Sequence, residues 1–154
     1  MSLRGNHAVR TRSSGAAALE FAIILPVLLT VVIGIVYFGI VLALQQVLTL
    51  AAEEGARAAL RYPSGASANT AAATQALRVS AASSTALAML PTSISSLIPA
   101  GNVAQVISCA NPGGSVCVKV TLSLTSSSIL PVVPGVPLPT TLTGSATVQL
   151  SPDT

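Results

Sequence analysis

The chain has 154 residues, of which 51% are hydrophobic and only 7% are charged. A soluble domain typically carries about a quarter charged residues, so this composition argues against an ordinary soluble enzyme. The formal net charge is +3, but the basic residues form no stripe with interleaved aromatic residues, which argues against nucleic acid as a partner.

Residues 21–44 form a run without a charged residue. Because about 20 residues span the hydrocarbon core of a bilayer as a helix, the run predicts one membrane-spanning helix. The apolar part of a cleaved secretory leader is only about 7–15 residues long, so this run is too long for a leader of the usual type. Arg4, Arg10 and Arg12 precede the run closely, whereas later basic residues are more distant and mixed with acidic ones. The positive-inside rule therefore places the N-terminus in the cytoplasm and the rest in the periplasm or outside the cell.

The helix is predicted to continue beyond the membrane. Residues 45–62 contain good helix formers and no proline, and their apolar positions recur every three or four residues. The sequence Pro63-Ser64-Gly65 is a stop signal. A helix over residues 16–62 follows, with a kink at Pro26.

Glu20 directly precedes the uncharged run, where a carboxylate calls for a partner. A short basic leader before it ends at Gly15. Cleavage after Gly15 would make Ala16 the N-terminus, and Ala16 and Glu20 share a helix face at spacing i, i+4. The new α-amine, with a pKa of about 8, would then be a cationic partner for this carboxylate. The alternative is a solvated Glu at a helix start, favoured by the helix dipole.

The string RTRSSGAAALEF, residues 10–21, resembles the processing site of type IV prepilins and pseudopilins. The resemblance implies that a prepilin peptidase cuts between Gly15 and Ala16. It also implies that Glu20, followed by Phe21, is needed for processing or for subunit contact.

Residues 15–39, together with AAEEGARA at residues 51–58, resemble the TadE-like family of minor pilins of the tight-adherence pilus. In that family an acidic residue often precedes the Phe-Gly at the end of the run, where this chain has Tyr37. The resemblance implies a minor pilin or pseudopilin in the inner membrane that contributes to pilus assembly, surface adhesion or biofilm formation. Its partners would be the prepilin peptidase, other pilin or pseudopilin subunits and the assembly machinery.

Small residues at Gly34, Gly39 and Ala43 offer surfaces through which the helix can pack closely against other helices. Three alternatives to the pilin of a tight-adherence pilus stay open. They are an uncleaved membrane-anchored adhesion or scaffold protein, a secreted protein cut near Ala43, and a pseudopilin of a secretion system.

A second helix is predicted over the alanine-rich residues 69–90, with Asn69 or Ser67 as its N-cap. Pro91 to Pro99 is predicted to be a loop.

Residues 116–125 alternate between apolar and polar over ten positions, which is typical of a half-buried strand. Residues 103–109 are predicted to pair with it across a turn at 110–115, and residues 143–150 form a third strand. The residues predicted to face the core are Val116, Val118, Val120, Leu122, Leu124, Ala146, Val148 and Leu150.

Cys109 and Cys117 flank the predicted hairpin turn. Antiparallel pairing would bring them opposite each other, within disulfide reach, and an extracytoplasmic location permits oxidation. A metal pair or a redox pair is the alternative. A metal site needs more ligands, however, and His7, the one histidine, lies across the membrane. The spacing also differs from that of a CxxC motif, so a structural disulfide is predicted.

Residues 129–139 contain four prolines and predict a stiff apolar connector. The pattern favours a loop between two sheet edges over an exposed contact surface for a pilus partner.

The part of the chain predicted to lie on the extracytoplasmic side has no histidine. Its carboxylates are Glu53, Glu54 and Asp153, and they form no pair placed for acid–base chemistry. We therefore expect no enzymatic activity, cofactor, metal or small-molecule substrate. The predicted fold class is α+β: a basic leader over 1–15, a long helix over 16–62 and an extracytoplasmic head over 63–154.

Overall fold

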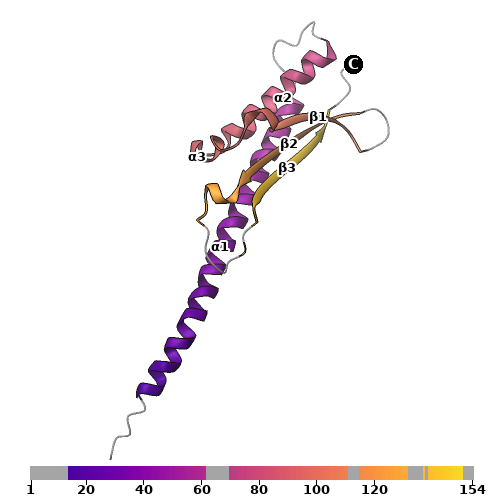
Figure 1. The fold of residues 1–154 in the computed structure, drawn as a ribbon. Helices are drawn as coiled ribbons and strands as arrows, with labels where there is room; N and C mark the ends of the chain where they lie inside the picture. The colour runs from indigo at the N-terminus through magenta and orange to yellow at the C-terminus, as the bar shows by residue number, and fades with distance from the viewer. Residues whose placement is uncertain (1–13, 62–69, 111–114, 132–136, 138, 151–154) are drawn as a thin grey trace, which may run out of the picture. The chain divides into compact units, whose positions relative to one another are not determined.

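The structure is a computed structural model that describes residues 14–61, 70–110, 115–131, 137 and 139–150. Its elements are α1 (Ser14–Leu60), α2 (Ala71–Ala88), α3 (Thr92–Ser95), a 3-10 turn (Ala100–Asn102), β1 (Ala104–Ser108), β2 (Val116–Thr125), a second 3-10 turn (Ser126–Ser128) and β3 (Thr141–Gln149) (Figure 1). The predicted α+β class is confirmed: a long apolar helix, a further helix and an antiparallel sheet.

The chain divides into two compact units between Tyr37 and Phe38. The second unit therefore contains the later part of α1 together with α2, α3 and the sheet. Several predicted features lie outside the described residues: most of the basic leader, the stop signal at 63–65, the hairpin turn at 111–114 and most of the connector at 129–139.

Within the described ranges the sheet has three strands in the order β1-β2-β3, and both neighbouring pairs are antiparallel. The strand predicted from the alternation at residues 116–125 is confirmed as β2. The strand β3 begins at Thr141, earlier than predicted, because Leu142 continues the alternation and is fully buried. One face of the sheet carries the buried residues Val118, Val120, Leu122, Leu124 and Leu142.

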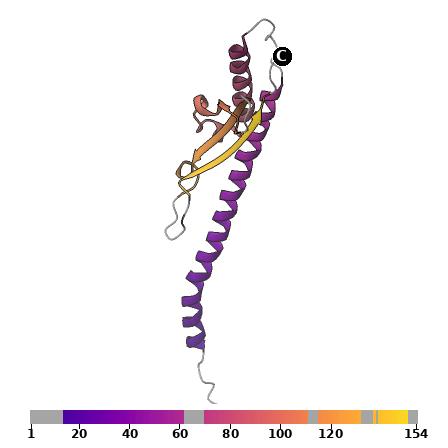
Figure 2. The ribbon, with the colours of Figure 1, turned by 90° about the vertical axis from the view of Figure 1, so that its right-hand side faces the viewer.

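Within the second unit, α1 and α2 lie together on the apolar face of the sheet (Figure 2). The buried residues of α1 are mostly small: Val41, Leu48, Ala51, Ala52, Ala56, Ala58 and Ala59. Small side chains let backbones approach closely, and two glycines mark the closest approaches. A Cβ added to Gly55 would lie 2.7 Å from the Cβ of Ala86 in α2, and one added to Gly144 would collide with the backbone of Leu48 and Thr49.

The helix α2 begins later than predicted, and its N-cap is Thr70. The backbone of Thr70 is extended, and its hydroxyl accepts a hydrogen bond from the N–H of Ala73 at 3.4 Å. The prediction of Asn69 or Ser67 as the cap was therefore wrong. Both residues lie outside the described part of the chain, and the helix starts after Thr70.

The prediction of a loop from Pro91 to Pro99 also needs correction, because the segment contains the short helix α3. The carbonyl of Pro91 accepts hydrogen bonds from the N–H groups of Ile94 and Ser95, both at 2.9 Å. The fixed φ of proline suits a helix start, and its missing N–H costs nothing there because the first N–H groups of a helix have no partner within the helix. Pro91 is therefore compatible with the start of α3.

Candidate functional site

The apolar part of α1 leaves its large side chains exposed. The exposed large apolar residues between positions 19 and 40 are Leu19, Phe21, Ile23, Ile24, Val27, Leu28, Leu29, Val31, Val32, Ile33, Ile35, Val36, Phe38 and Ile40. In length and composition α1 is the one helix of the described residues that could cross a membrane. An apolar surface of this extent is costly in water, so this part of α1 is a candidate membrane span.

The residues predicted for processing lie in the first two turns of α1. Gly15, Ala16, Glu20 and Phe21 are all exposed, and nothing lies within 4 Å of a Cβ built on Gly15. Because the segment is helical, Ala16 and Glu20 lie on one face, one turn apart.

The residues predicted for helix packing are accessible too. A Cβ added to Gly34 or Gly39 meets nothing within 4 Å, and Ala43 is exposed. Between these residues and the processing residues lies Pro26, whose carbonyl accepts a hydrogen bond from the hydroxyl of Thr30 at 2.8 Å. This bond gives the backbone beside the proline an additional partner.

In the head, Cys109 and Cys117 form a disulfide with a Cα–Cα distance of 5.2 Å. They are not directly opposite each other, contrary to the sequence analysis. Cys117 is paired with Ile107, and the N–H of Cys109 donates to the carbonyl of Ser115 at 3.2 Å. The disulfide therefore runs diagonally across the ladder and closes the end of the hairpin.

We expect replacement of both cysteines by serine to lower the free energy of unfolding of the head by about 2–3 kcal/mol, because the short closed loop no longer restricts the unfolded chain. Urea unfolding of the full chain in detergent, followed by hydrogen exchange of the β2 amides, measures this change. Ser123→Ala is the control, on the exposed face of the same strand. Equal stability of the double variant and the wild type would contradict the expectation.

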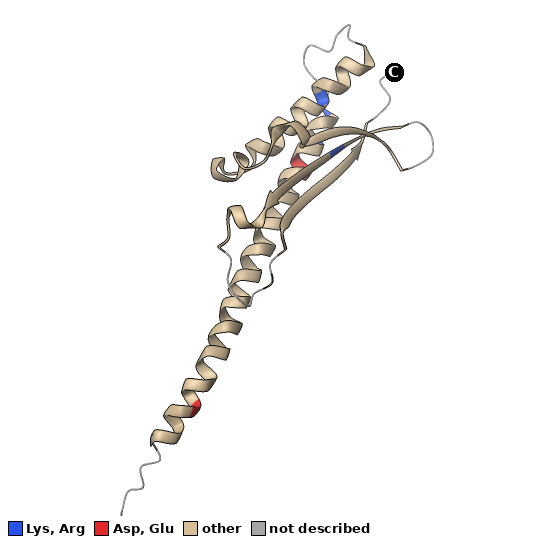
Figure 3. Ribbon diagram, viewed as in Figure 1, with Lys and Arg blue, Asp and Glu red and all other residues tan. Residues whose placement is uncertain are grey.

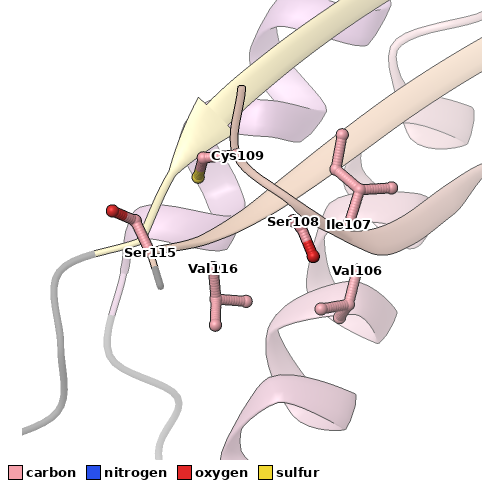
Figure 4. Close-up of a pocket in the computed structure, with 6 residues that line it drawn as sticks. All are labelled: Val106, Ile107, Ser108, Cys109, Ser115 and Val116. Carbon is pink, nitrogen blue, oxygen red and sulfur yellow. The ribbon is translucent and has the colours of Figure 1, made fainter. Parts of the chain in front are cut away.

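Described residues of the sheet line surface hollows. One hollow, of about 260 Å³, adjoins the disulfide, and Val106, Ser108 and Val116 are among the residues that line it (Figure 4). Another, of about 300 Å³, surrounds Lys119 on the polar face. Neither lining contains a histidine or a carboxylate, so neither offers a general base. The described residues also hold no group of three side chains suited to a metal ion.

Sequence reasoning missed three features of the second unit. Arg78 is only 5% exposed and lies on the buried face of α2 with Thr74, Ala82 and Ala86. Gly55 and Gly144 are contact points. The spacing of four residues between the buried positions of α2 was readable in the sequence, whereas the glycine contacts depend on how the elements cross.

The family described as TadE-like protein matches this chain over residues 15–57. The match covers most of α1 and less than a third of the chain. No curated protein and no solved structure matches the chain significantly. The chain is therefore TadE-like in the segment that forms α1, as the resemblance in its sequence predicted.

Proposed function

We propose that this protein is a minor pilin or pseudopilin of a tight-adherence pilus, contributing to pilus assembly, surface adhesion or biofilm formation. A TadE-like segment implies a protein associated with this pilus. The observation that carries the proposal is the coincidence of the family match with the helix whose apolar side chains are exposed. A TadE-like family member is a structural protein, and we propose no enzymatic activity or cofactor here.

The chain would cross the inner membrane once, with its N-terminus in the cytoplasm and its head in the periplasm or outside the cell. Two observations support this orientation. The basic residues Arg4, Arg10 and Arg12 precede the apolar run. The disulfide of the head fits an oxidising compartment, since cytosolic thiols are kept reduced.

A prepilin peptidase would cut between Gly15 and Ala16 and free an α-amine one helical turn from Glu20. In a medium of low dielectric constant, a partner of opposite charge lowers the free-energy cost of burying the Glu20 carboxylate. The partner would be the amine of the same chain or of an adjacent subunit. The small residues Gly34, Gly39 and Ala43 would then allow close lateral packing against other pilus helices.

The test is the N-terminus and the intact mass of the chain purified from membranes, with and without a co-expressed prepilin peptidase. We expect a start at Ala16 only when the peptidase is present, and loss of this product in Gly15→Leu. Glu20→Gln should disturb processing or the recovery of mature chain with other subunits. The matched control is Glu53→Gln, which changes an exposed carboxylate of the same helix.

Other results would point to the other candidates. An unprocessed N-terminus under both conditions would contradict the pilin proposal and indicate a plain membrane anchor. A start near Leu44 would indicate a secreted protein. Processing with assembly only into a secretion machine would indicate a pseudopilin of that system.

A further inference from the structure

Among the described residues, no strand pairs with the outer edge of β3. The N–H of Leu150 donates to the carbonyl of Val116 at 2.8 Å, and that of Ser126 donates to the carbonyl of Thr140 at 3.0 Å. Both pairs continue the β2–β3 register. Because hydrogen-bonded residues alternate along an antiparallel strand, the even-numbered residues of β3 bond to β2. The residues whose backbone groups point outward are Thr141, Thr143, Ser145, Thr147 and Gln149.

The outer edge of β1 likewise has no partner strand in the described part of the chain. The N–H of Thr121 donates to the carbonyl of Val103 at 2.7 Å, and that of Cys109 donates to the carbonyl of Ser115. Odd-numbered residues of β1 therefore bond to β2, and the backbone groups of Ala104, Val106 and Ser108 point outward. Within the described residues no further strand pairs with either edge.

The described residues of the two edge strands lack the charges, prolines and bulges that commonly prevent edge pairing. Natural edge strands are commonly guarded by charged residues, prolines or bulges. The strands β1 and β3 contain no charged residue and no proline, and their registers with β2 are continuous. Charged residues are also scarce in the described part of the head (Figure 3). The sequence and register of β1 and β3 are therefore compatible with pairing to another strand.

The two edges also carry apolar side chains that the head covers incompletely. Val106, on the apolar face at the β1 edge, is 43% exposed. Ala146 and Val148, on the same face at the β3 edge, are half-buried. The strand register places Val106 and Val148 on one face, since both lie opposite Val118. Bringing the two edges together would cover all three.

The helix layer is compatible with such a contact. The helix α2 packs on β1 and β2, whereas α1 meets β2 at Val120, through Gly55, and β3 at Gly144. If β1 of a second copy followed β3, α2 of that copy would follow α1 in the second layer. Sheet and helices would then both continue across the junction.

We propose that β3 of one copy pairs with β1 of a second copy, in parallel, to make a continuous sheet. Both strands are antiparallel to β2 and so run in the same direction, which keeps the α1 helices of the two copies pointing the same way. This step rests on the proposed function, because helices in one membrane must share an orientation.

A symmetric β3–β3 pair would reverse one α1, because the contacts of α1 advance from Leu48 to Gly55 in the direction of β3. A head-to-tail contact of this kind does not close on itself, so further copies or related subunits can be added.

The test is cysteine crosslinking between two full-length variants that carry different tags and are co-reconstituted in one bilayer. One variant is Gln105→Cys on β1, and the other is Ser145→Cys or Thr147→Cys on β3, all on the polar face. We expect mild oxidation to give at least ten times more mixed dimer than like-with-like dimer. Ser123→Cys, on the central strand of the same face, replaces the β3 variant as the control and should give no mixed dimer.

A further variant tests the backbone contact itself. Ser145→Pro removes an outward N–H without removing a bond to β2, and it should abolish crosslinking through Thr147→Cys, whereas Ser123→Lys should not. Three outcomes would overturn the proposal: like-with-like dimers of the β3 variant, no crosslink, or a crosslink unaffected by Ser145→Pro. A chain that fails to crosslink but is still cut at Gly15 refutes only the edge contact and leaves the proposed function intact.

Discussion

Replacing Gly144 by valine should destabilise the head by about 3 kcal/mol or more, at the upper end of the range for overpacking. A Cβ at this position would meet the backbone of Leu48 and Thr49 in α1 rather than a side chain that could rotate away. Relief would require β3 to lift off α1, which would expose Leu142 and Leu122. Hydrogen exchange of the β2 amides in the full chain measures the change.

The matched control for Gly144 is Gly101→Val. A Cβ at Gly101 meets nothing within 4 Å, so this substitution changes the same residue type in open space. We expect it to cost less than about 1 kcal/mol, within the range of surface substitutions. If the two variants were equally stable, the crossing of β3 over α1 at Gly144 would be wrong.

Replacing Gly55 by valine should cost a similar amount, about 3 kcal/mol. Glycine inside a helix is less favourable than alanine by about 1 kcal/mol, so on propensity alone a side chain would stabilise α1. The contacts outweigh this gain. A Cβ would lie 2.7 Å from the Cβ of Ala86 and 2.8 Å from the carbonyl oxygen of Ala82, and the second of these belongs to the backbone of α2.

Gly39→Val is the control for Gly55, because it places the same side chain on the same helix where nothing lies within 4 Å. Thermal unfolding of the head in the full-length chain in detergent, monitored by protease sensitivity, distinguishes the two variants. We expect a lower midpoint for Gly55→Val and an unchanged midpoint for Gly39→Val. A stabilised Gly55→Val would show that helix propensity dominates and that α2 does not pack at this point.

The sequence predicted the elements whose patterns are strong and local. Ten alternating residues suffice for β2, because one side of the strand is buried and the other is solvated. The long uncharged run and the absence of proline from 45–62 predicted α1 to within two residues at each end. The TadE-like resemblance was found in the same segment, which forms α1.

The features that were missed depend on contacts between distant parts of the chain. The diagonal disulfide follows from a register that the loop length alone does not set. The role of Gly144 depends on where β3 crosses α1, and the burial of Arg78 depends on which face of α2 meets the sheet. The N-cap at Thr70 was missed for a local reason, since Ser67, Asn69 and Thr70 are all acceptable caps.

The burial of Val41 has a consequence for how the chain sits in lipid. Val41 is only 3% exposed, so its own protein already occupies the space that acyl chains would fill. On the side of α1 that carries Val41, the lipid-accessible surface therefore ends near Ile40, whereas Leu42 and Ala43 remain exposed on other sides of the helix. Residues 21–40 of α1 measure about 30 Å at 1.5 Å per residue, close to a typical hydrocarbon thickness. In the proposed membrane setting, part of the circumference of α1 would therefore face protein instead of acyl chains from Val41 onward.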